Sequence, residues 1–96
     1  MELKELSIGQ VVMSKAGRDK GRPFFVVGLV DSQKVLVADG DVRRLQNPKL
    51  KKIKHLIIYN LISEEVKNRL HGDLKAHDAF MRKELERLGL KTKREV

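Results

Sequence analysis

The chain has 96 residues, with 21 Lys or Arg against 13 Asp or Glu, a formal net charge of +8 at pH 7 and a sequence pI near 10.0. This length allows one small domain with an appendage but excludes two independent cores. The absence of Cys excludes disulfides and thiolate metal sites. No basic leader and no apolar run of about 18 residues is visible, so we expect a cytoplasmic protein with a polyanionic partner and no membrane contact.

The positive charge is unevenly distributed along the chain. Residues 1–60 hold 12 Lys or Arg against six acids, whereas residues 61–96 hold nine against seven. We therefore expect an anion-binding domain over residues 1–60 and a nearly balanced helical extension over residues 61–96.

Three short strands are predicted first, at 10–14, 23–30 and 34–38. Pro23 should begin the second of them, and Gly28 should mark a bend or bulge within it. The apolar residues from Val11 to Met13 do not alternate with polar ones, which indicates burial on both sides, as in a small closed barrel.

Asp39 and Gly40 give a strong hairpin signal, which predicts a fourth, short strand over 42–45. The apolar run from Leu56 to Tyr59 predicts the fifth. Five short strands with these turns favour a mainly β fold, a small five-stranded SH3-like barrel with a C-terminal helical extension.

A helix should begin at Ser63, whose hydroxyl can cap free amides ahead of two acids. Residues 71–73 offer a break, after which a second helix has one apolar face ending near Gly89. That face holds Leu74, His77, Met81, Leu85 and Leu88. We expect it to pack on its own barrel, in a monomer rather than a homodimer; a second copy or another protein are the alternatives.

Two basic segments carry the candidate site. The loop from Gly17 to Arg22 places cations between glycines that allow a phosphate to approach the backbone, although it could be an ordinary exposed loop. The run from Arg43 to His55 has six Lys or Arg and no acid, with apolar residues that can anchor it. It indicates RNA contact, and a solubilising face is the alternative.

The first segment and its flanking strands resemble the KOW domains of ribosomal proteins and transcription elongation factors. The shared positions are Gly9, Val11, Met13, Gly17, Lys20, Gly21, Phe25 and Val27. Phe24 departs from the pattern, since it stands where the family has a glycine. Arg43-Arg44-Leu45 and Ile53-Lys54-His55-Leu56 are similar to the branch of the large-subunit ribosomal protein numbered fourteen. The resemblance covers residues 7–58.

The resemblance implies an RNA-binding protein of the translation machinery that acts as a ribosomal protein or a ribosome-associated factor. The partners it implies are structured RNA, namely rRNA, and ribosomal proteins. Together with the charge pattern it gives the RNA-binding residues Lys15, Arg18, Lys20, Arg22, Arg43, Arg44, Lys49, Lys51, Lys52, Lys54 and His55. Because few aromatic residues are free to stack on bases, we expect binding by shape and backbone, not sequence reading of a single strand. A protein-interaction module of the elongation-factor KOW type is the alternative, and nonspecific DNA binding is a third.

Nothing in the sequence favours catalysis. The three His residues lack ligand spacing, and Asp39 and Asp41 are more typical of a turn than of an acid-base pair. Neither a Ser-His-Asp arrangement nor a Walker loop is present. We therefore expect no enzyme activity, no cofactor and no metal.

Overall fold

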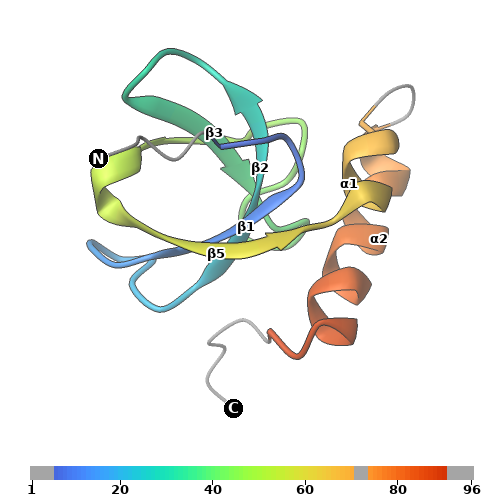
Figure 1. Cartoon of the computed structure of the whole chain (residues 1–96). Helices are drawn as coiled ribbons and strands as arrows, with labels where there is room; N and C mark the ends of the chain where they lie inside the picture. The colour runs from blue at the N-terminus through green and yellow to red at the C-terminus, as the bar shows by residue number, and fades with distance from the viewer. Residues whose placement is uncertain (1–5, 71–73, 91–96) are drawn as a thin grey trace.

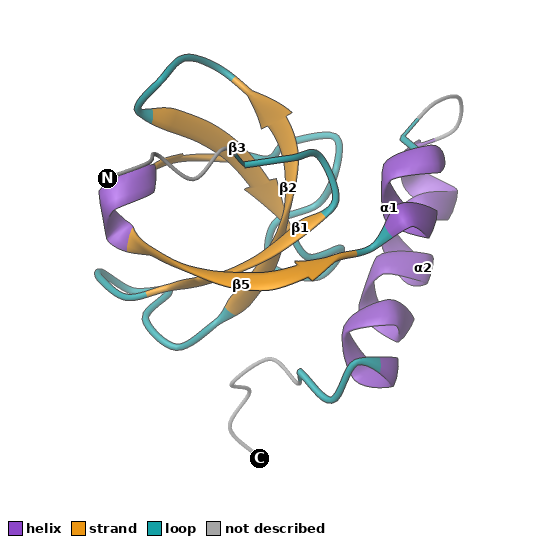
Figure 2. Cartoon of the chain, in the orientation of Figure 1, coloured by secondary structure: helices purple, strands orange, loops and turns teal. Residues whose placement is uncertain are grey.

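Five antiparallel strands form one sheet, and two helices follow it (Figures 1 and 2). The structure is a computed structural model that describes residues 6–70 and 74–90. The strand order is β4-β3-β2-β1-β5. The elements are β1 (Gln10–Ser14), β2 (Pro23–Leu29), β3 (Lys34–Ala38), β4 (Lys49–Lys52), the 3-10 turn η1 (Ile53–His55), β5 (Leu56–Ile62), α1 (Glu64–Asn68) and α2 (Leu74–Arg87). The mainly β fold with a helical C-terminal part is confirmed.

The fourth strand is not where the sequence predicted it. Residues 42–45 lie in a loop, and the strand that pairs with β3 is β4, in which Lys49 faces Val37. The Asp39 carboxylate accepts hydrogen bonds from the backbone N–H groups of Asp41 and Arg43, at 2.9 and 3.0 Å. A side chain that binds these donors competes with a strand ladder, so the chain continues as a loop until Lys49.

The other strands lie close to their predicted bounds. Pro23 begins β2, and the pairing register with β3 shifts between Val26 and Gly28, as expected for a bulge. A Cβ added at Gly28 would lie 3.0 Å from the Leu36 side chain, which explains a glycine at this close approach. The last strand, β5, runs past Tyr59 to Ile62 and so crosses the boundary expected at residue 60.

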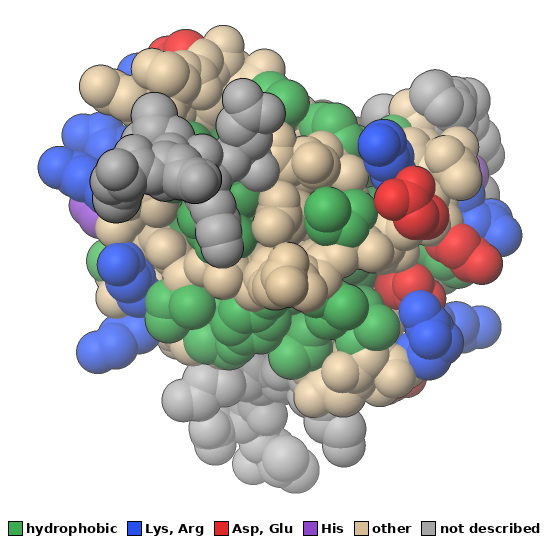
Figure 3. Space-filling view, in the orientation of Figure 1, with side chains coloured by type: hydrophobic (Ala, Val, Ile, Leu, Met, Phe, Trp, Pro, Cys, Tyr) green, Lys and Arg blue, Asp and Glu red, His purple; other side chains and the backbone are tan. Residues whose placement is uncertain are grey.

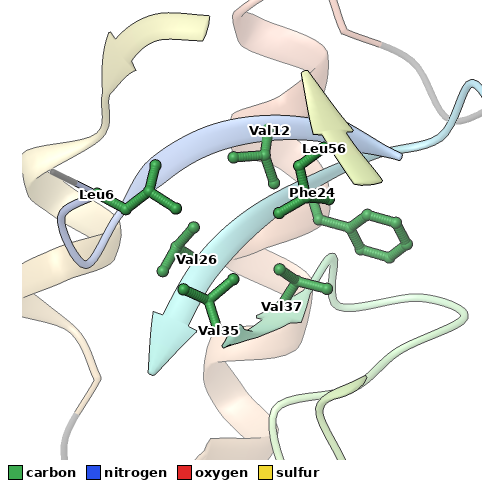
Figure 4. Close-up of a cluster of buried hydrophobic side chains, with 7 residues drawn as sticks. All are labelled: Leu6, Val12, Phe24, Val26, Val35, Val37 and Leu56. Atoms are coloured by element: carbon green, nitrogen blue, oxygen red, sulfur yellow. The ribbon is translucent and has the colours of Figure 1, made fainter. Parts of the chain in front are cut away.

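Two apolar clusters bury both faces of the central strands. The inner cluster consists of Leu6, Val12, Phe24, Val26, Val35, Val37 and Leu56 (Figure 4). The outer cluster consists of Val11, Phe25, Ala38, Leu45, Val66, Met81 and Leu85. Neighbours such as Phe24 and Phe25 thus point to opposite faces, and each buried ring contributes about 1.5–3 kcal/mol. The missing alternation therefore did indicate burial on both sides.

The two helices pack against the outer cluster of the sheet (Figure 2). The predicted packing of the helical extension on its own barrel is therefore confirmed. Ser63 caps α1, because its hydroxyl accepts a hydrogen bond from the Val66 N–H at 3.2 Å. Gly89 has a φ of +78° after α2, and the Leu90 N–H donates to the Leu85 carbonyl at 2.8 Å, as in a glycine C-cap. The predicted break over 71–73 lies outside the described residues.

Two hydrogen bonds attach α2 to the loop that follows β3. The Asp78 carboxylate accepts from the Leu45 N–H at 2.9 Å, and Arg82 donates to the Gly40 carbonyl at 2.6 Å. Gly40 has a φ of +79°, and a Cβ there would collide with the Asp78 carbonyl. This turn and α2 are therefore in direct backbone contact.

Candidate nucleic-acid interface

The β1–β2 loop is a hydrogen-bonded structure that presents three exposed cations. Gly17 and Gly21 have φ values of +75° and +84°. The Gly21 N–H donates to the Ser14 carbonyl and the Arg22 N–H to the Asp19 carbonyl, both at 2.8 Å. The exposed cations are Lys15, Arg18 and Lys20. A Cβ at Gly17 would meet nothing within 4 Å, so the loop surface is open to an approaching ligand.

Lys49 and Lys51 face into the barrel. Their cross-strand partners Val37 and Val35 belong to the inner cluster, and partners directly opposite share a face of the sheet. The stems of these lysines therefore cover apolar side chains while the ammonium groups reach the β1–β2 loop.

Asp19 receives both of these lysines. Its Oδ2 lies 3.1 Å from the Lys49 Nζ and 3.4 Å from the Lys51 Nζ, and Lys51 also donates to the Ser14 hydroxyl at 3.2 Å. Burial acts to raise the pKa of Asp19, but the hydrogen bond and charge of Lys49 and the charge of Lys51 hold it below the ordinary value of 3.8. The loop and β4 are thus joined, and two predicted RNA-binding lysines have an internal partner.

Arg22 is directed inward as well. One guanidinium nitrogen lies 3.8 Å from the Asp39 Oδ2, and neither atom has a hydrogen-bond partner among the described residues. Burial raises the pKa of Asp39, an effect only partly opposed by the backbone N–H groups of Arg43 and Asp41 and by the charge of Arg22. The Arg22 side chain therefore lies next to Asp39 at the end of the β1–β2 loop and does not extend into solvent.

Arg43 and Arg44 are separated from the lysines that follow them in the sequence. Both lie in the loop between the Asp39 turn and Leu45, whose N–H is bound by Asp78 of α2. Arg44 is exposed and Arg43 is half-buried. The basic run from Arg43 to His55 is consequently divided between this loop beside α2 and the segment formed by β4 and η1.

A second group of exposed cations lies at the end of β4 and in η1. Lys52 and Lys54 are exposed, and the Lys15 N–H donates to the carbonyl of half-buried His55 at 3.0 Å. In Figure 3 Lys and Arg side chains lie at the left beside η1 and this loop without an acidic side chain among them, whereas Lys and Arg side chains over the helices at the right are mixed with acidic ones. Lys15, Arg18 and Lys20 thus lie on the β1–β2 loop, and Lys52 and Lys54 lie at the neighbouring η1, which this loop contacts through Lys15. η1 is on the side of the sheet away from the helices (Figure 1).

The sequence pattern indicated no binding role for Asp19, Lys34, Ser32 or Gln33. Asp19 is the one acid in the β1–β2 loop, and that isolation was the available signal. Lys34 lies directly opposite Lys52, which a sequence shows only once the fourth strand is correctly placed. Ser32 and Gln33 are ordinary turn residues by composition and carried no signal.

Over residues 6–70 and 74–90, no group of three or more His, Cys, Asp or Glu is placed to hold a metal ion. Neither helix, as far as it is described, has the length and apolar character needed to cross a membrane.

No protein-family model matches the chain, so the KOW resemblance stays an interpretation of individual residues. One curated relative is 38% identical over 64 residues, which cover 67% of this chain and 86% of the relative. It is named "Putative ribosome-binding protein YbzG" and comes from Bacillus subtilis (strain 168). Identity at this level over most of the relative's length shows common ancestry, and the chain belongs to the same family as this B. subtilis protein.

Proposed function

We propose that this protein binds the ribosome by gripping structured rRNA with the cationic end of its barrel. The observation that supports it is the group of five exposed cations, which form no ion pair with any residue in the described part of the chain. The name of the B. subtilis relative points to the same target. In this proposal the protein is cytoplasmic, is not an enzyme and needs no cofactor.

The binding mechanism is electrostatic. Each Lys or Arg that neutralises a phosphate releases condensed counterions, and fixed loops lower the entropy lost when the cations are positioned. The Asp19 contacts hold the β1–β2 loop against β4, and the Lys15–His55 hydrogen bond holds it against η1. The cations are thus arranged before RNA arrives, which suits recognition of a folded RNA by its shape.

Salt dependence of binding to purified large ribosomal subunits tests the proposal. If five phosphates are neutralised, log K should fall against log salt with a slope of about −3.5 to −4.5. The matched control removes two exposed cations from the helices, Lys67→Gln with Lys83→Gln, and should leave the slope unchanged. A flat salt response, or an equal loss in the helix control, would contradict the proposal.

A protein contact on the ribosome is the second candidate function. It is favoured by large apolar side chains of β5 that remain exposed, Ile57, Leu61 and Ile62 at 43%, 36% and 41%. Figure 3 shows an apolar band along this strand. Capture of partners by the tagged protein before and after ribonuclease digestion separates the two, because only protein contacts survive digestion.

A further inference from the structure

A hollow lies between the β2–β3 loop and the start of η1. It is lined by Ser32, Gln33, Lys52, Ile53 and Lys54 and has a volume of about 410 Å³. This volume falls in the range of small-ligand sites, about 300–1,000 Å³. Ser32, Gln33 and Ile53 are not among the residues proposed to bind rRNA phosphates.

The walls of this hollow are fixed by local hydrogen bonds. The Ile53 N–H donates to the Gln33 carbonyl at 2.8 Å, which ties η1 to the β2–β3 loop. The Asp31 carboxylate accepts from the N–H groups of Gln33 and Lys34 at 2.8 and 2.9 Å, which closes the loop as an Asx turn. The hollow is therefore present before any ligand binds.

The charge around the hollow favours an anion. Lys34 and Lys52 are directly opposite each other on β3 and β4, an arrangement of like charges that destabilises a sheet. Lys54 adds a third ammonium group, and none of the three pairs with an acid of the described chain. Asp31 is the adjacent acid, and one of its oxygens is already occupied by backbone donors. A phosphate bound next to Lys52 and Lys54 would offset the positive charge that these three lysines place on this part of the surface.

The remaining lining is suited to more than a phosphate. Ile53 is partly buried against the inner cluster and gives an apolar floor. The side chains of Ser32 and Gln33 are exposed and make no hydrogen bond with described residues, so each retains a free donor and acceptor. A simple anion would contact neither Ile53 nor the Gln33 amide. The bases of a duplex are paired and stacked, so they could not enter the hollow.

We propose that this hollow binds one unstacked nucleotide of the bound RNA. Its phosphate lies between Lys52 and Lys54, its base lies on Ile53, and Gln33 hydrogen-bonds the base edge. The inference rests on the proposed rRNA binding and adds a local base contact to it, in contrast to the purely backbone recognition expected from the sequence.

Amide NMR spectra of the full chain test the site directly, with adenosine 5′-monophosphate, inorganic phosphate and adenosine compared at one ionic strength. The nucleotide should shift the amides of Gln33, Ile53 and Lys54 in a saturable way, and phosphate should shift the lysine amides only. Gln33→Ala, which keeps the charge, should weaken nucleotide binding about two- to tenfold and leave phosphate binding unchanged. Equal responses to nucleotide and phosphate, or shifts confined to the β1–β2 loop, would overturn the site.

Binding to large ribosomal subunits separates this inference from the function on which it rests. Lys52→Gln with Lys54→Gln should weaken binding by at least about tenfold, and Gln33→Ala by about two- to tenfold. If Gln33→Ala binds subunits and nucleotide like the wild type while Arg18→Gln with Lys20→Gln is impaired, the nucleotide site is wrong and rRNA binding stands. If the wild type itself shows no RNA affinity, the proposed function fails, and with it the assignment of the hollow to an RNA nucleotide.

Discussion

Asp19 of the β1–β2 loop and Lys51 of the edge strand β4 form an ion pair, with 3.4 Å between Oδ2 and Nζ. The Lys51 side chain is only 10% exposed, because its stem lies over the inner cluster. A residue predicted to bind RNA therefore joins two parts of the fold, and it shares the Asp19 carboxylate with Lys49.

Asp19→Asn should destabilise the protein by about 1–2 kcal/mol at neutral pH, because it leaves two partly buried lysines without their carboxylate. The folded-state pKa of Asp19 is lowered, so its contribution is present above 3.8 and is lost as the pH falls through the lowered pKa. Urea unfolding should show the gap between wild type and variant closing on acidification. Glu86→Gln, an exposed acid on α2, is the control, and a pH-independent gap would contradict the assignment.

Asp39→Asn should show the opposite pH trend. The folded-state pKa of Asp39 is raised, so its contribution is fully present below 3.8 and is lost as the pH rises through the raised pKa. Wild type should therefore gain stability relative to the variant as the pH falls. Parallel unfolding curves for the Asp19 and Asp39 variants check this; trends of the same sign would refute the burial argument for Asp39.

Ser63→Ala should cost about 1–2 kcal/mol, because the hydroxyl makes two contacts. It caps α1 at the Val66 N–H and donates to the Glu84 carboxylate of α2 at 2.9 Å. Ser63→Thr retains the hydroxyl and should recover most of the loss. Unfolding free energies of both variants provide the measurement, and equal loss in both would argue against the hydrogen bonds.

Gly40→Ala should be far more damaging than Gly17→Ala. Both glycines have positive φ, which costs a non-glycine residue about 1–2 kcal/mol. At Gly40 the new methyl would also collide with the Asp78 backbone, whereas at Gly17 the space is open. Thermal unfolding should rank the two variants in this order, and similar melting temperatures would mean that the turn and α2 are not in contact.

Arg18→Gln with Lys20→Gln should reduce the salt slope of rRNA binding by about 1.5, since each removed phosphate contact accounts for about 0.7–0.9. Lys49→Gln with Lys51→Gln removes the same charge but should leave the slope nearly unchanged, because these lysines are paired with Asp19. Filter binding over a series of salt concentrations distinguishes the pairs. Equal reductions would show that Lys49 and Lys51 also contact RNA.

Much of the fold could be predicted because local signals and tertiary packing agree in most places. Pro23, Gly28, Ser63 and Gly89 each act within a few residues, and all four do what their chemistry predicts. The fourth strand could not be placed in this way. The Asp39 side chain binds the donors that a hairpin would need, and the Asp78 contact with Leu45 comes from a distant helix.

The arrangement of the predicted site residues could be predicted less well than the fold, for a related reason. A count of charges along the sequence treats every Lys and Arg as a surface group. Tertiary pairing removes Arg22, Lys49 and Lys51 from that group, and the loop after β3 carries Arg43 and Arg44 toward α2. Side chains alternate between the two faces of β4, so the inward-facing lysines can be told from the outward-facing ones only once this strand is placed at Lys49–Lys52.

Asp78 and Arg82 of α2 bind the loop around Gly40 by hydrogen bonds, and this loop in turn connects α2 to the β1–β2 loop. The same turn contains Asp39, which neighbours Arg22 at the foot of the β1–β2 loop. A chain cut after Ile62 would therefore lose more than an appendage. It would expose Val11 and Phe25 to water. It would also lose the contacts of α2 with the turn that pairs with Arg22 of the β1–β2 loop, so we expect the barrel alone to be unstable.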